Sequence, residues 1–487
     1  MNKKTNNLQG NRRNFIKKGI AAASLMIVPR HVLGGTGYTA PSDQMNIAGI
    51  GVGGKGRTDI LNSWVNGRER VVALCDVDPQ GSHGVTQSIK KFPKANFYDS
   101  FKKMLDTEKD IDAVTISSPD HTHAPAATYA MERGIHVYVQ KPLTHNIKEA
   151  RLLTEMAREK KLVTQMGNQG ASNPDQLSVQ GWVDSGVVGP ISKVYVWTNR
   201  PVWPQGIQMP LPDASLKPST LNWDQWLGPA TETPFIPKMH PFNWRGWWDY
   251  GTGALGDMGC HIIDIPFRAL GLKYPTDVEC SVGSVFSKMW VPDHIPQGCP
   301  PTSSVTINFD ATEKNNSPIE MVWTDGGIRP THPDLIPADV DLGANGILMI
   351  GEKGIISADV YGTNPKLYLK GEDVQLGAKR VIDRPGPEFG HHRKWIDACK
   401  AGFNSEEHLA LTSSFDYSGP LTETVLMGNI AIRSYLLRNK LATNGRRARY
   451  DYYARKKLLW DGDNMRITNL EEANQFVGRT YRKGWEL

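Results

Sequence analysis

An acidic residue and a histidine lie four positions apart in the segment Gly253–Asp264, which reads GALGDMGCHIID. If this segment is a helix, Asp257 and His261 lie on the same face. A histidine with a pKa of about 6.5 can accept the proton of a hydroxyl group and return it, while Asp257 orients the imidazole or a substrate. The alternative is a metal pair, with His123 as a third ligand. We predict catalysis without a metal, because no further ligand cluster lies near these residues in the sequence.

A glycine-rich loop, Ile50–Gly56 with the sequence IGVGGKG, separates an apolar run from a predicted helix. Gly51 allows a tight turn, Gly53 lets the backbone approach a pyrophosphate, and Gly56 permits close contact between helix and strand. The free amides at the helix N-terminus then bind the anionic pyrophosphate. An alternative register that begins at Gly49 stays open. The predicted dinucleotide-binding residues of this loop are Gly51, Val52, Gly53, Gly54 and Gly56.

An aspartate ends the next apolar run. Asp76 follows Val71–Cys75 and lies 20 residues after Gly56. An acid at this position binds the ribose hydroxyls of the adenosine and repels a 2′-phosphate. The sequence therefore predicts NAD as the cofactor in preference to NADP, whereas the alternative is an ordinary aspartate at a strand end.

Polar residues follow two further apolar runs, in the segments ISSPDHTH (Ile116–His123) and VYVQKP (Val137–Pro142). The carboxyl ends of parallel strands meet at the edge of the sheet where ligands bind. We therefore predict that both segments contact the cofactor. The predicted cofactor-binding residues beyond the glycine loop and Asp76 are Ser117, Ser118, Pro119, His123, Gln140, Lys141 and Asn168.

Strand and helix patterns alternate from Met45 to about Met166. The apolar runs are rich in Val and Ile, as buried parallel strands are, and the clearest helical periodicity spans Asn146–Lys160. This alternation predicts an α/β domain with a doubly wound parallel sheet, that is, a Rossmann dinucleotide-binding domain over residues 44–168. The predicted strands are Met45–Ile50, Val71–Cys75, Ala113–Ser117, His136–Gln140 and Leu162–Met166.

The pattern changes after about residue 170. Loops rich in Gly, Pro and Trp precede alternating strands, which predict an α+β domain with an open, mostly antiparallel sheet over residues 169–440. Residues 441–487 show no clear period and are predicted to be a tail that packs on the body. The predicted strands are Ser303–Phe309, Ile319–Thr324, Ile347–Ile350 and Lys366–Lys370, and the predicted helices are Gly390–Lys400 and Leu421–Leu437.

The order of these motifs resembles the Gfo/Idh/MocA oxidoreductases, in particular a Bacteroidetes-type branch that carries a twin-arginine signal. The likeness extends from about Met45 to Leu487 and includes Pro-Asp-His-Thr-His and a strand that ends in Lys-Pro. It implies that Lys141, Asp257 and His261 form the catalytic set, with Lys141 hydrogen-bonded to the reacting hydroxyl. It also implies a homodimer or homotetramer. The family usually has Glu before the lysine, whereas this chain has Gln140, which removes a negative charge.

Aromatic residues with interleaved polar groups occur in HPFNWRGWWDY, residues His240–Tyr250. Aromatic faces pack against the C–H groups of sugar rings, while polar side chains bind the hydroxyls. A sugar or sugar-like polyol is therefore the predicted substrate, although any single tryptophan could instead fill the core or an interface. The predicted substrate-binding residues are Trp203, Asn243, Trp244, Arg245 and Trp248.

The chain of 487 residues is too long for one compact core, and its net charge of +6 is spread along it. The basic clusters Arg446–Arg449 and Arg455–Lys457 are short, so we expect no nucleic-acid partner. The five cysteines show neither close pairs nor metal-ligand spacing, and free thiols are expected.

The N-terminal residues differ from the rest of the chain. Asn11–Lys18 (NRRNFIKK) precedes the short apolar run Gly19–Val28, and the paired arginines resemble a twin-arginine export signal. We predict a signal peptide over residues 1–40 and a periplasmic protein exported after folding. No later segment has the ~18 consecutive apolar residues of a membrane span, so no stable membrane insertion is expected.

Export limits the mechanism, because the periplasm should hold little free NAD. The first hypothesis is a sugar oxidoreductase whose tightly held cofactor is recycled in place by reduction of a second substrate. The second is an NAD-dependent glycoside hydrolase that acts by transient oxidation and elimination. The third is a non-enzymatic sugar-binding protein with a vestigial cofactor site. The intact residues Gly51, Gly53, Asp76, Lys141 and His261 argue against it.

Overall fold

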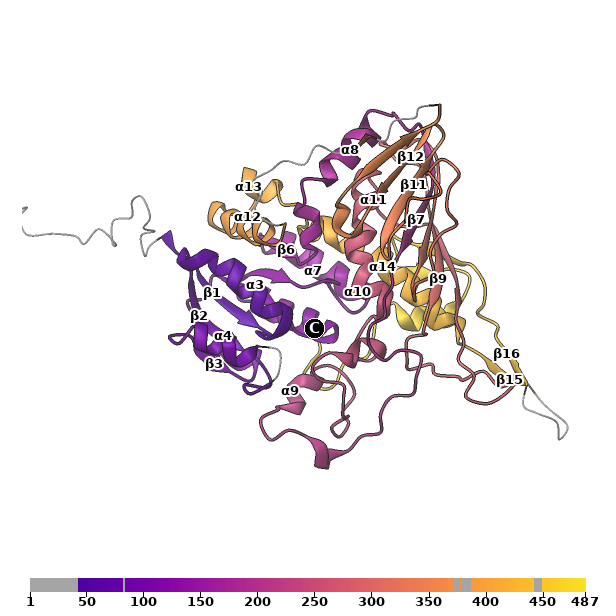
Figure 1. Cartoon of the computed structure of the whole chain (residues 1–487). Coiled ribbons are helices and arrows are strands. Elements are labelled where there is room, and N and C mark those ends of the chain that lie inside the picture. The colour runs from indigo at the N-terminus through magenta and orange to yellow at the C-terminus, as the bar shows by residue number, and fades with distance from the viewer. Residues whose placement is uncertain (1–42, 82–83, 372–375, 378–386, 442–448) are drawn as a thin grey trace, which may run out of the picture.

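The computed structural model describes residues 43–81, 84–371, 376–377, 387–441 and 449–487 (Figure 1). The predicted export signal, residues 1–40, and most of the basic cluster Arg446–Arg449 lie outside the described residues. Within these ranges, no helix combines the length and the apolar character that crossing a bilayer requires. All five cysteines are free thiols, as expected.

Six parallel strands form the first sheet, in the order β3-β2-β1-β4-β5-β6. Every residue of the central strand β4 is buried, as is typical of a parallel sheet that is covered on both faces. The strands are β1 (Asn46–Ile50), β2 (Arg70–Cys75), β3 (Asn96–Tyr98), β4 (Ala113–Ile116), β5 (His136–Val139) and β6 (Thr164–Met166), and the helices between them are α3 (Gly54–Trp64), α4 (Val85–Lys91), α5 (Phe101–Thr107), α6 (Asp120–Met131) and α7 (Ile147–Glu159).

Ten strands form the second sheet, in the order β14-β13-β12-β11-β7-β10-β9-β8-β17-β18. Its described pairs are antiparallel except that β7 and β10 run parallel. The strands are β7 (Ile191–Trp197), β8 (Asp277–Val282), β9 (Ser303–Phe309), β10 (Ile319–Thr324), β11 (Gly346–Gly351), β12 (Gly354–Ala358), β13 (Lys366–Leu369), β14 (Leu376–Gly377), β17 (Leu458–Asp461) and β18 (Arg466–Ile467), while β15 (Asn439–Leu441) and β16 (Arg449–Asp451) form a separate hairpin.

Helices lie between the two sheets, as Figure 1 shows. Burial alternates along β9 and β10, so that one face of the second sheet packs inward, and α14 contacts β8 and β9 on that face. This layer also holds α10, which carries Asp257 and His261. The helices of this part are α8 (Gln176–Asp184), α9 (Trp223–Leu227), α10 (Gly253–Ile262), α11 (Asp264–Ala269), α12 (Pro387–Ala401), α13 (Glu406–Leu409) and α14 (Phe415–Tyr435).

The first sheet is completed by residues from late in the chain. Trp395 and Ile396 of α12 share an apolar core cluster with Ile47 and Ile60, and α12 packs against α3. The side chains of Trp395 and Ile396 are fully buried. The layer that covers this side of the Rossmann sheet therefore contains a helix separated from it by more than 200 positions in the sequence.

The last residues also return to the first domain. The guanidinium of Arg479 donates to the His121 carbonyl (2.5 Å), and that of Arg482 donates to the Gly228 carbonyl (2.9 Å). The ring of Trp485 packs edge-on against Phe101, with centroids 5.7 Å apart. The C-terminal segment thus fastens the first domain to the loops beside the second.

The structure confirms the predicted fold class, a Rossmann-type domain followed by an α+β domain with an open, mostly antiparallel sheet. The predicted strands at Ser303–Phe309 and Ile319–Thr324 have the predicted bounds. Several features differ from the prediction. Strand β3, none of whose three residues is buried, was not expected, and neither were β7, β8 and β12. Strand β17 pairs with β8, so the tail extends the sheet as well as packing on it.

Candidate active site

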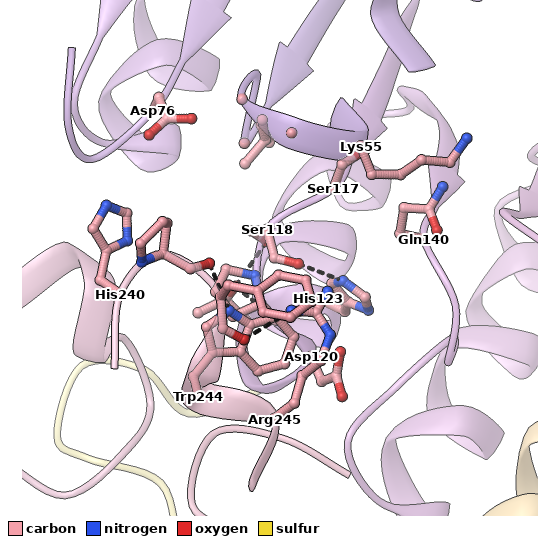
Figure 2. A pocket seen from close by; sticks show the side chains of 18 of the residues that line it. Lys55, Asp76, Ser117, Ser118, Asp120, His123, Gln140, His240, Trp244 and Arg245 are labelled. Carbon is pink, nitrogen blue, oxygen red and sulfur yellow. Dashed lines mark hydrogen bonds between the residues drawn. The ribbon is translucent and has the colours of Figure 1, made fainter. Parts of the chain in front are cut away.

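A cavity of about 570 Å³ lies where the carboxyl ends of the Rossmann strands face α10 and the loop after residue 199. In Figure 2, Asp76 and Lys55 lie on the side of the first sheet, and Trp244 and Arg245 lie across from them. The cavity therefore joins the predicted cofactor residues of one domain to the predicted catalytic and substrate residues of the other. This is the position in which open α/β sheets bind ligands.

The glycine loop begins with a tight turn directly after β1. Gly51 has a φ of +72°, and a Cβ atom on it would lie 2.7 Å from the Ser118 backbone nitrogen. A Cβ on Gly56 would lie 1.7 Å from the Gly51 carbonyl oxygen, so helix α3 packs too closely on the loop for any other residue. These contacts favour the register Gly51, Gly53, Gly56. Helix α3 starts at Gly54 and directs its N-terminus at the cavity.

Asp76 lies at the end of β2 and lines the cavity. Its carboxylate accepts hydrogen bonds from the backbone N–H groups of Val52 (3.0 Å) and Asp78 (3.2 Å). Burial raises the pKa of Asp76 to about 6, against these hydrogen bonds. The carboxylate is therefore tied to the glycine loop and ionised at neutral pH, as an acceptor for two ribose hydroxyls must be.

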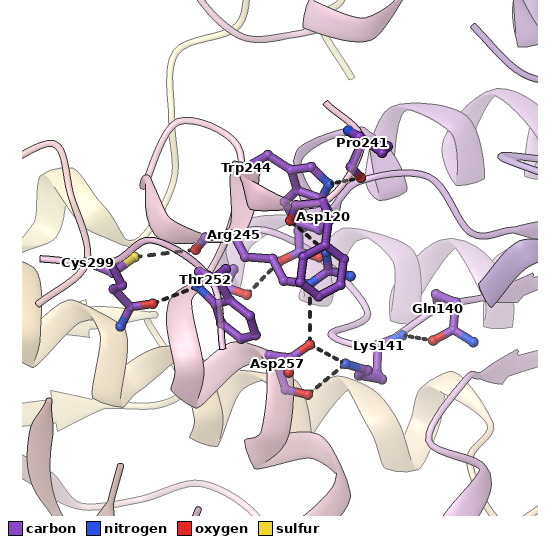
Figure 3. A network of polar contacts seen from close by, with 12 residues as sticks. Asp120, Gln140, Lys141, Pro241, Trp244, Arg245, Thr252, Asp257 and Cys299 are labelled. Atoms are coloured by element: carbon purple, nitrogen blue, oxygen red, sulfur yellow. Dashed lines mark hydrogen bonds and ion pairs between the residues drawn. The ribbon is translucent and has the colours of Figure 1, made fainter. Parts of the chain in front are cut away.

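Lys141 and Asp257 form an ion pair between the two domains. The Lys141 ammonium donates to Asp257 Oδ1 (2.8 Å) and to the Asp257 carbonyl oxygen (2.7 Å), while the Arg245 guanidinium lies 3.5 Å from the same carboxylate (Figure 3). Both side chains of the pair are about 15% exposed, and that exposure faces the cavity. Although burial opposes ionisation, the charge of Lys141 and then that of Arg245 hold the pKa of Asp257 at about 2.

His261 lies one helical turn after Asp257 and also lines the cavity. Burial, and after it the charge of Lys141, lowers the pKa of His261 well below its ordinary value, so the imidazole is neutral. Its ring packs edge-on against Tyr361, with centroids 4.9 Å apart. Its Nδ1 has no hydrogen-bond partner among the described residues. The neutral imidazole is the form that can accept a proton, while the charge of Lys141 favours the return of that proton.

Arg245 forms the wall opposite the first sheet. Its guanidinium lies over Trp244 (4.1 Å to the ring centroid) and over Phe242 (4.5 Å). Trp203 and His240 line the same wall. Aromatic side chains and a cation therefore line the cavity opposite the first sheet, and these residue types also bind hydroxylated rings.

Residues 45–168 match the oxidoreductase family with an NAD-binding Rossmann fold, Gfo/Idh/MocA, and residues 178–283 match the C-terminal alpha/beta domain of the same family. The chain belongs to the Gfo/Idh/MocA oxidoreductases. A glycosyl hydrolase family 109 protein of Shewanella pealeana is 29% identical over 200 residues, which cover 37% of this chain and 44% of that protein. Levoglucosan dehydrogenase of Pseudarthrobacter phenanthrenivorans is 23% identical over 208 residues, 42% of this chain and 43% of that one.

This Gfo/Idh/MocA chain thus spans less than half the length of these curated relatives. The solved structure of a levoglucosan dehydrogenase with NADH aligns over 80% of the chain and 96% of that structure, with a TM-score of 0.54 and 16% identity. At this identity the likeness concerns the fold. The glycine turn at Gly51 and the carboxylate of Asp76 independently fit the pyrophosphate and the ribose of a dinucleotide.

The structure brings most of the predicted residues of this Gfo/Idh/MocA site together. Val52 and Gly56 belong to the glycine loop but do not line the cavity, and the fully buried Asn168 does not line it either. Among the predicted substrate residues, Asn243 does not line it either, and Trp248 faces a different, smaller cavity. The predicted residues that do line it are Gly51, Gly53, Gly54, Asp76, Ser117, Ser118, Pro119, His123, Gln140, Lys141, Trp203, Trp244, Arg245, Asp257 and His261.

Of the two roles predicted for Asp257, contact with the imidazole of His261 is not observed, because the carboxylate binds Lys141; orientation of a substrate stays a prediction. The metal alternative finds no support in the described residues, where no three His, Cys, Asp or Glu side chains gather around a possible ion. The two ring nitrogens of His123 instead contact the carbonyls of Pro142 (2.9 Å) and Ser118 (2.8 Å). His123 thus joins the loops after β4 and β5.

Gln140, in place of the family's usual Glu, contacts a buried acid that sequence reasoning missed. Its Nε2 donates to Asp59 Oδ2 (2.8 Å), while its Oε1 accepts from the Lys141 backbone N–H (3.2 Å). Asp59 lies on α3 and is fully buried. The negative charge that the Gln removes from the strand end is therefore present on the neighbouring helix.

Asp59 is held by three further groups. Ser117 Oγ donates to Oδ2 (2.8 Å), and His392 Nε2 (2.9 Å) and the Lys55 ammonium (3.2 Å) lie at Oδ1. Although full burial opposes ionisation, the charge of Lys55 and the contact with His392 lower the pKa of Asp59 far below its ordinary value. Lys55 also lines the cavity. Its place inside the glycine loop was the one sequence signal that could have pointed to this cluster.

Asp120 and Tyr361 also line the cavity and were not predicted as site residues. Thr252, at the start of α10, donates its hydroxyl to Asp120 Oδ2 (2.6 Å, Figure 3). Burial raises the pKa of Asp120 above its ordinary value. Asp120 belongs to the Pro-Asp-His-Thr-His motif, which was a usable signal, whereas Tyr361 lies in a loop without any motif.

Proposed function

We propose that this protein is an NAD-dependent oxidoreductase that transfers a hydride from or to a hydroxyl-bearing carbon of a sugar, glycoside or polyol. One observation carries this proposal. The Lys141–Asp257 ion pair and the neutral His261 line the same cavity as the glycine loop and Asp76. A proton acceptor, a cationic hydrogen-bond donor and a dinucleotide site therefore converge on one space.

The chain's own residues handle the proton and the charge. The Lys141 ammonium, held in place by Asp257, donates to the substrate oxygen and stabilises the negative charge that develops there. The neutral His261 accepts the hydroxyl proton and returns it in the reverse direction. When bound, the nicotinamide supplies the hydride acceptor. Arg245 and the aromatic wall orient the substrate ring over Lys141.

NAD is favoured over NADP by the same carboxylate that binds the ribose. Asp76 is fixed by two backbone N–H groups and cannot turn away from a 2′-phosphate without breaking both hydrogen bonds. The Coulomb repulsion between a carboxylate and a phosphate then disfavours NADP. The aligned levoglucosan dehydrogenase structure is a complex with NADH, which supports the same choice.

We further propose export by the twin-arginine route, with the cofactor loaded beforehand and recycled in place. The pair Arg12–Arg13 and the short apolar run Gly19–Val28 support this location. The fastening of the first domain by Arg479 and Arg482 supports retention of a bound cofactor. A homo-oligomer, as the family resemblance implies, completes the proposal and is tested by sedimentation.

The second candidate is a glycoside hydrolase that oxidises its substrate transiently. The similarity to a glycosyl hydrolase family 109 protein favours it specifically. Oxidation of one hydroxyl to a ketone acidifies the neighbouring C–H, elimination expels the aglycone, water adds to the double bond, and the hydride returns. This cycle consumes water alone and needs no second oxidant. The same Lys141 and His261 serve the oxidation step.

The test begins with the mass of the nucleotide that denaturation releases from the purified protein. Candidate sugars and glycosides are then mixed with the loaded protein, and absorbance of the reduced nicotinamide is followed in a single turnover. We expect NAD, and we expect Lys141→Met to slow its reduction by roughly 10²–10⁴-fold at unchanged nucleotide content. Lys109→Met, an exposed lysine, is the matched control.

Product analysis separates the two candidates. A ketosugar or a reduced second sugar supports the oxidoreductase, and free aglycone supports the hydrolase. If Lys141→Met reduces its nicotinamide as fast as the wild type, the catalytic assignment of Lys141 is wrong.

A further inference from the structure

The ring of Tyr361 lies against His261 and also lines the main cavity, yet the proposed reaction does not use it. The two rings meet edge-on, with centroids 4.9 Å apart and planes at 88° to each other. His261 belongs to α10, whereas Tyr361 belongs to the short 3-10 segment Val360–Gly362 between β12 and β13. The contact therefore depends on how the fold holds this segment against the helix.

The backbone of Tyr361 is held in a strained conformation. Its φ is +66°, in the left-handed region that a bulky residue rarely adopts. The Asn173 amide nitrogen donates to the Tyr361 carbonyl (3.1 Å), and Gly170 packs so closely that a Cβ atom on it would lie 2.9 Å from Tyr361 Cβ. Strain of this kind persists where the surroundings enforce it, and it gathers at functional sites. The neighbours thus fix the Tyr361 ring in the cavity wall beside His261.

The two nitrogens of His261 differ in their surroundings. Nδ1 is buried and has no hydrogen-bond partner among the described residues. Because Nδ1 is enclosed, a proton that His261 exchanges with the cavity passes through Nε2. A neutral imidazole carries one proton, so Nε2 can accept another only if the first is on Nδ1. The role of His261 as a proton acceptor therefore requires a buried Nδ1–H that meets neither a nitrogen nor an oxygen acceptor in the described part of the chain.

We propose that Tyr361 is a positioning residue for His261, whose ring face receives the Nδ1–H and shields Nδ1 from water. The face of an aromatic ring carries partial negative charge and accepts an N–H, and this contact forms when the two rings are perpendicular. The opposite tautomer would direct a lone pair at the same face and would be repelled. Tyr361 thus selects the tautomer in which Nε2 accepts the proton of the substrate hydroxyl.

The charged and titratable groups around His261 come from four elements. Lys141 follows β5, Asp257 lies one turn earlier on α10, Lys55 lies on α3, and His391 lies on α12. Burial, and after it the charge of Lys141, keeps the pKa of His261 low, while Asp257 opposes this. Water that reached Nδ1 would solvate the imidazolium and weaken the effect of burial, so the pKa would rise toward about 6.5. A variant that lacks the tyrosine ring should therefore show a raised His261 pKa.

This inference rests on the proposed function for the catalytic use of His261, but the contact itself can be measured without substrate. Nuclear magnetic resonance of the purified protein with 15N-labelled histidine rings reports the pKa of His261 and which nitrogen carries its proton, and His261→Gln identifies the signals. We expect the Nδ1–H tautomer in the wild type and no titration of His261 between pH 5 and pH 8. Tyr361→Leu should raise the pKa of His261 by at least about one unit, into this range. Tyr361→Phe, which keeps the ring, and Tyr450→Leu, the matched control on an exposed tyrosine, should both keep the wild-type titration.

Single-turnover reduction of the bound nicotinamide then links the contact to the reaction. Only the neutral imidazole accepts a proton, and a base with a pKa of about 6.5 is about nine-tenths protonated at pH 5.5. The rate of Tyr361→Leu relative to the wild type should therefore fall about tenfold between pH 8 and pH 5.5. If the resonance changes as expected and this ratio stays constant, His261 is not the proton acceptor, and the proposed function fails while the contact stands.

If Tyr361→Leu does not fold, Gly170→Ala takes its place, because the added Cβ forces Tyr361 to shift while its ring and hydroxyl stay intact. Gly170→Ala should also raise the pKa of His261. A His261 pKa that the substituted variant leaves unchanged, or a wild-type proton on Nε2, would overturn the proposal. A Tyr361→Phe protein that titrates like Tyr361→Leu would assign the effect to the hydroxyl and overturn it as well.

Discussion

Replacing Gln140 by glutamate tests whether the acid on α3 has taken the place of the family's usual glutamate. In Gln140→Glu, two carboxylates would meet where the Gln140 amide now donates to Asp59 across 2.8 Å. At an effective dielectric constant of about 20, two unit charges at this distance repel by about 6 kcal/mol, equivalent to about 4 pKa units. Lys55 already offsets part of the Asp59 charge, so we expect the pKa of the introduced glutamate to rise by about 2–4 units.

The sign of the pH dependence follows from this rise. Between the unfolded pKa of a glutamate, about 4.3, and the raised folded value, the native variant binds more protons than the unfolded chain, so its stability falls as pH rises. The free energy of unfolding should lie within about 1 kcal/mol of wild type at pH 5 and about 3–5 kcal/mol below it at pH 8.5. Denaturant unfolding at several pH values measures this difference, and bound nucleotide is quantified in the same samples.

The double variant Asp59→Asn, Gln140→Glu is the matched control, since it exchanges the acid and the amide and lets the introduced asparagine donate to the introduced carboxylate. It should recover most of the stability and the nucleotide content at pH 8.5. A Gln140→Glu protein whose stability relative to wild type is independent of pH, or a double variant no better than the single one, would refute the reasoning.

Three further predictions concern the cofactor, the base and the location. The affinity of the nucleotide-free protein for NAD should fall about tenfold per pH unit below about pH 6, where Asp76 gains a proton. The Asp76→Asn variant should bind NAD weakly and without this pH dependence. Fluorescence titration measures both affinities, and an affinity of Asp76→Asn that still depends on pH would exclude Asp76 as the source. His261→Ala should slow single-turnover reduction of the bound nicotinamide by roughly 10²–10⁴-fold with normal nucleotide content, and a wild-type rate would assign the proton transfer to another group. Arg12→Lys with Arg13→Lys should leave the protein in the cytoplasm on cell fractionation, whereas unchanged periplasmic protein would mean that the signal was misread.

The sequence alone predicted those features that depend on a periodic pattern or on the spacing of neighbouring residues. The periodicity of Val and Ile predicted the Rossmann strands, and the four-residue spacing of Asp257 and His261 predicted one face of α10, which the structure shows. Strand β3 escaped prediction because none of its three residues is buried, so it is not part of an apolar run. Residue spacing thus predicts a helix or strand where the element is long enough to show a periodic pattern.

Contacts between distant segments could not be predicted in this way. Asp59 meets Gln140 and His392 only after the chain folds. Lys55 in the glycine loop marks the neighbourhood of Asp59, but the sequence does not identify Asp59 as a partner of the Lys-Pro strand. Trp248 belongs to an aromatic segment that suggests sugar binding, yet its indole faces the small cavity beside Arg433. Composition indicates which residues can bind a ligand, whereas tertiary contacts decide which of them reach it.

The late return of the chain to its first domain has a consequence for biosynthesis. The strands of the Rossmann sheet are translated before α12, which covers them, and before Arg479, Arg482 and Trp485, which also contact the first domain or the loops beside it. The apolar surface beneath Trp395 stays uncovered while the second domain is being made. A nascent chain can therefore form the nucleotide-binding sheet early but cannot close it until these later segments have been made. The domain that is synthesised first is the last to be finished.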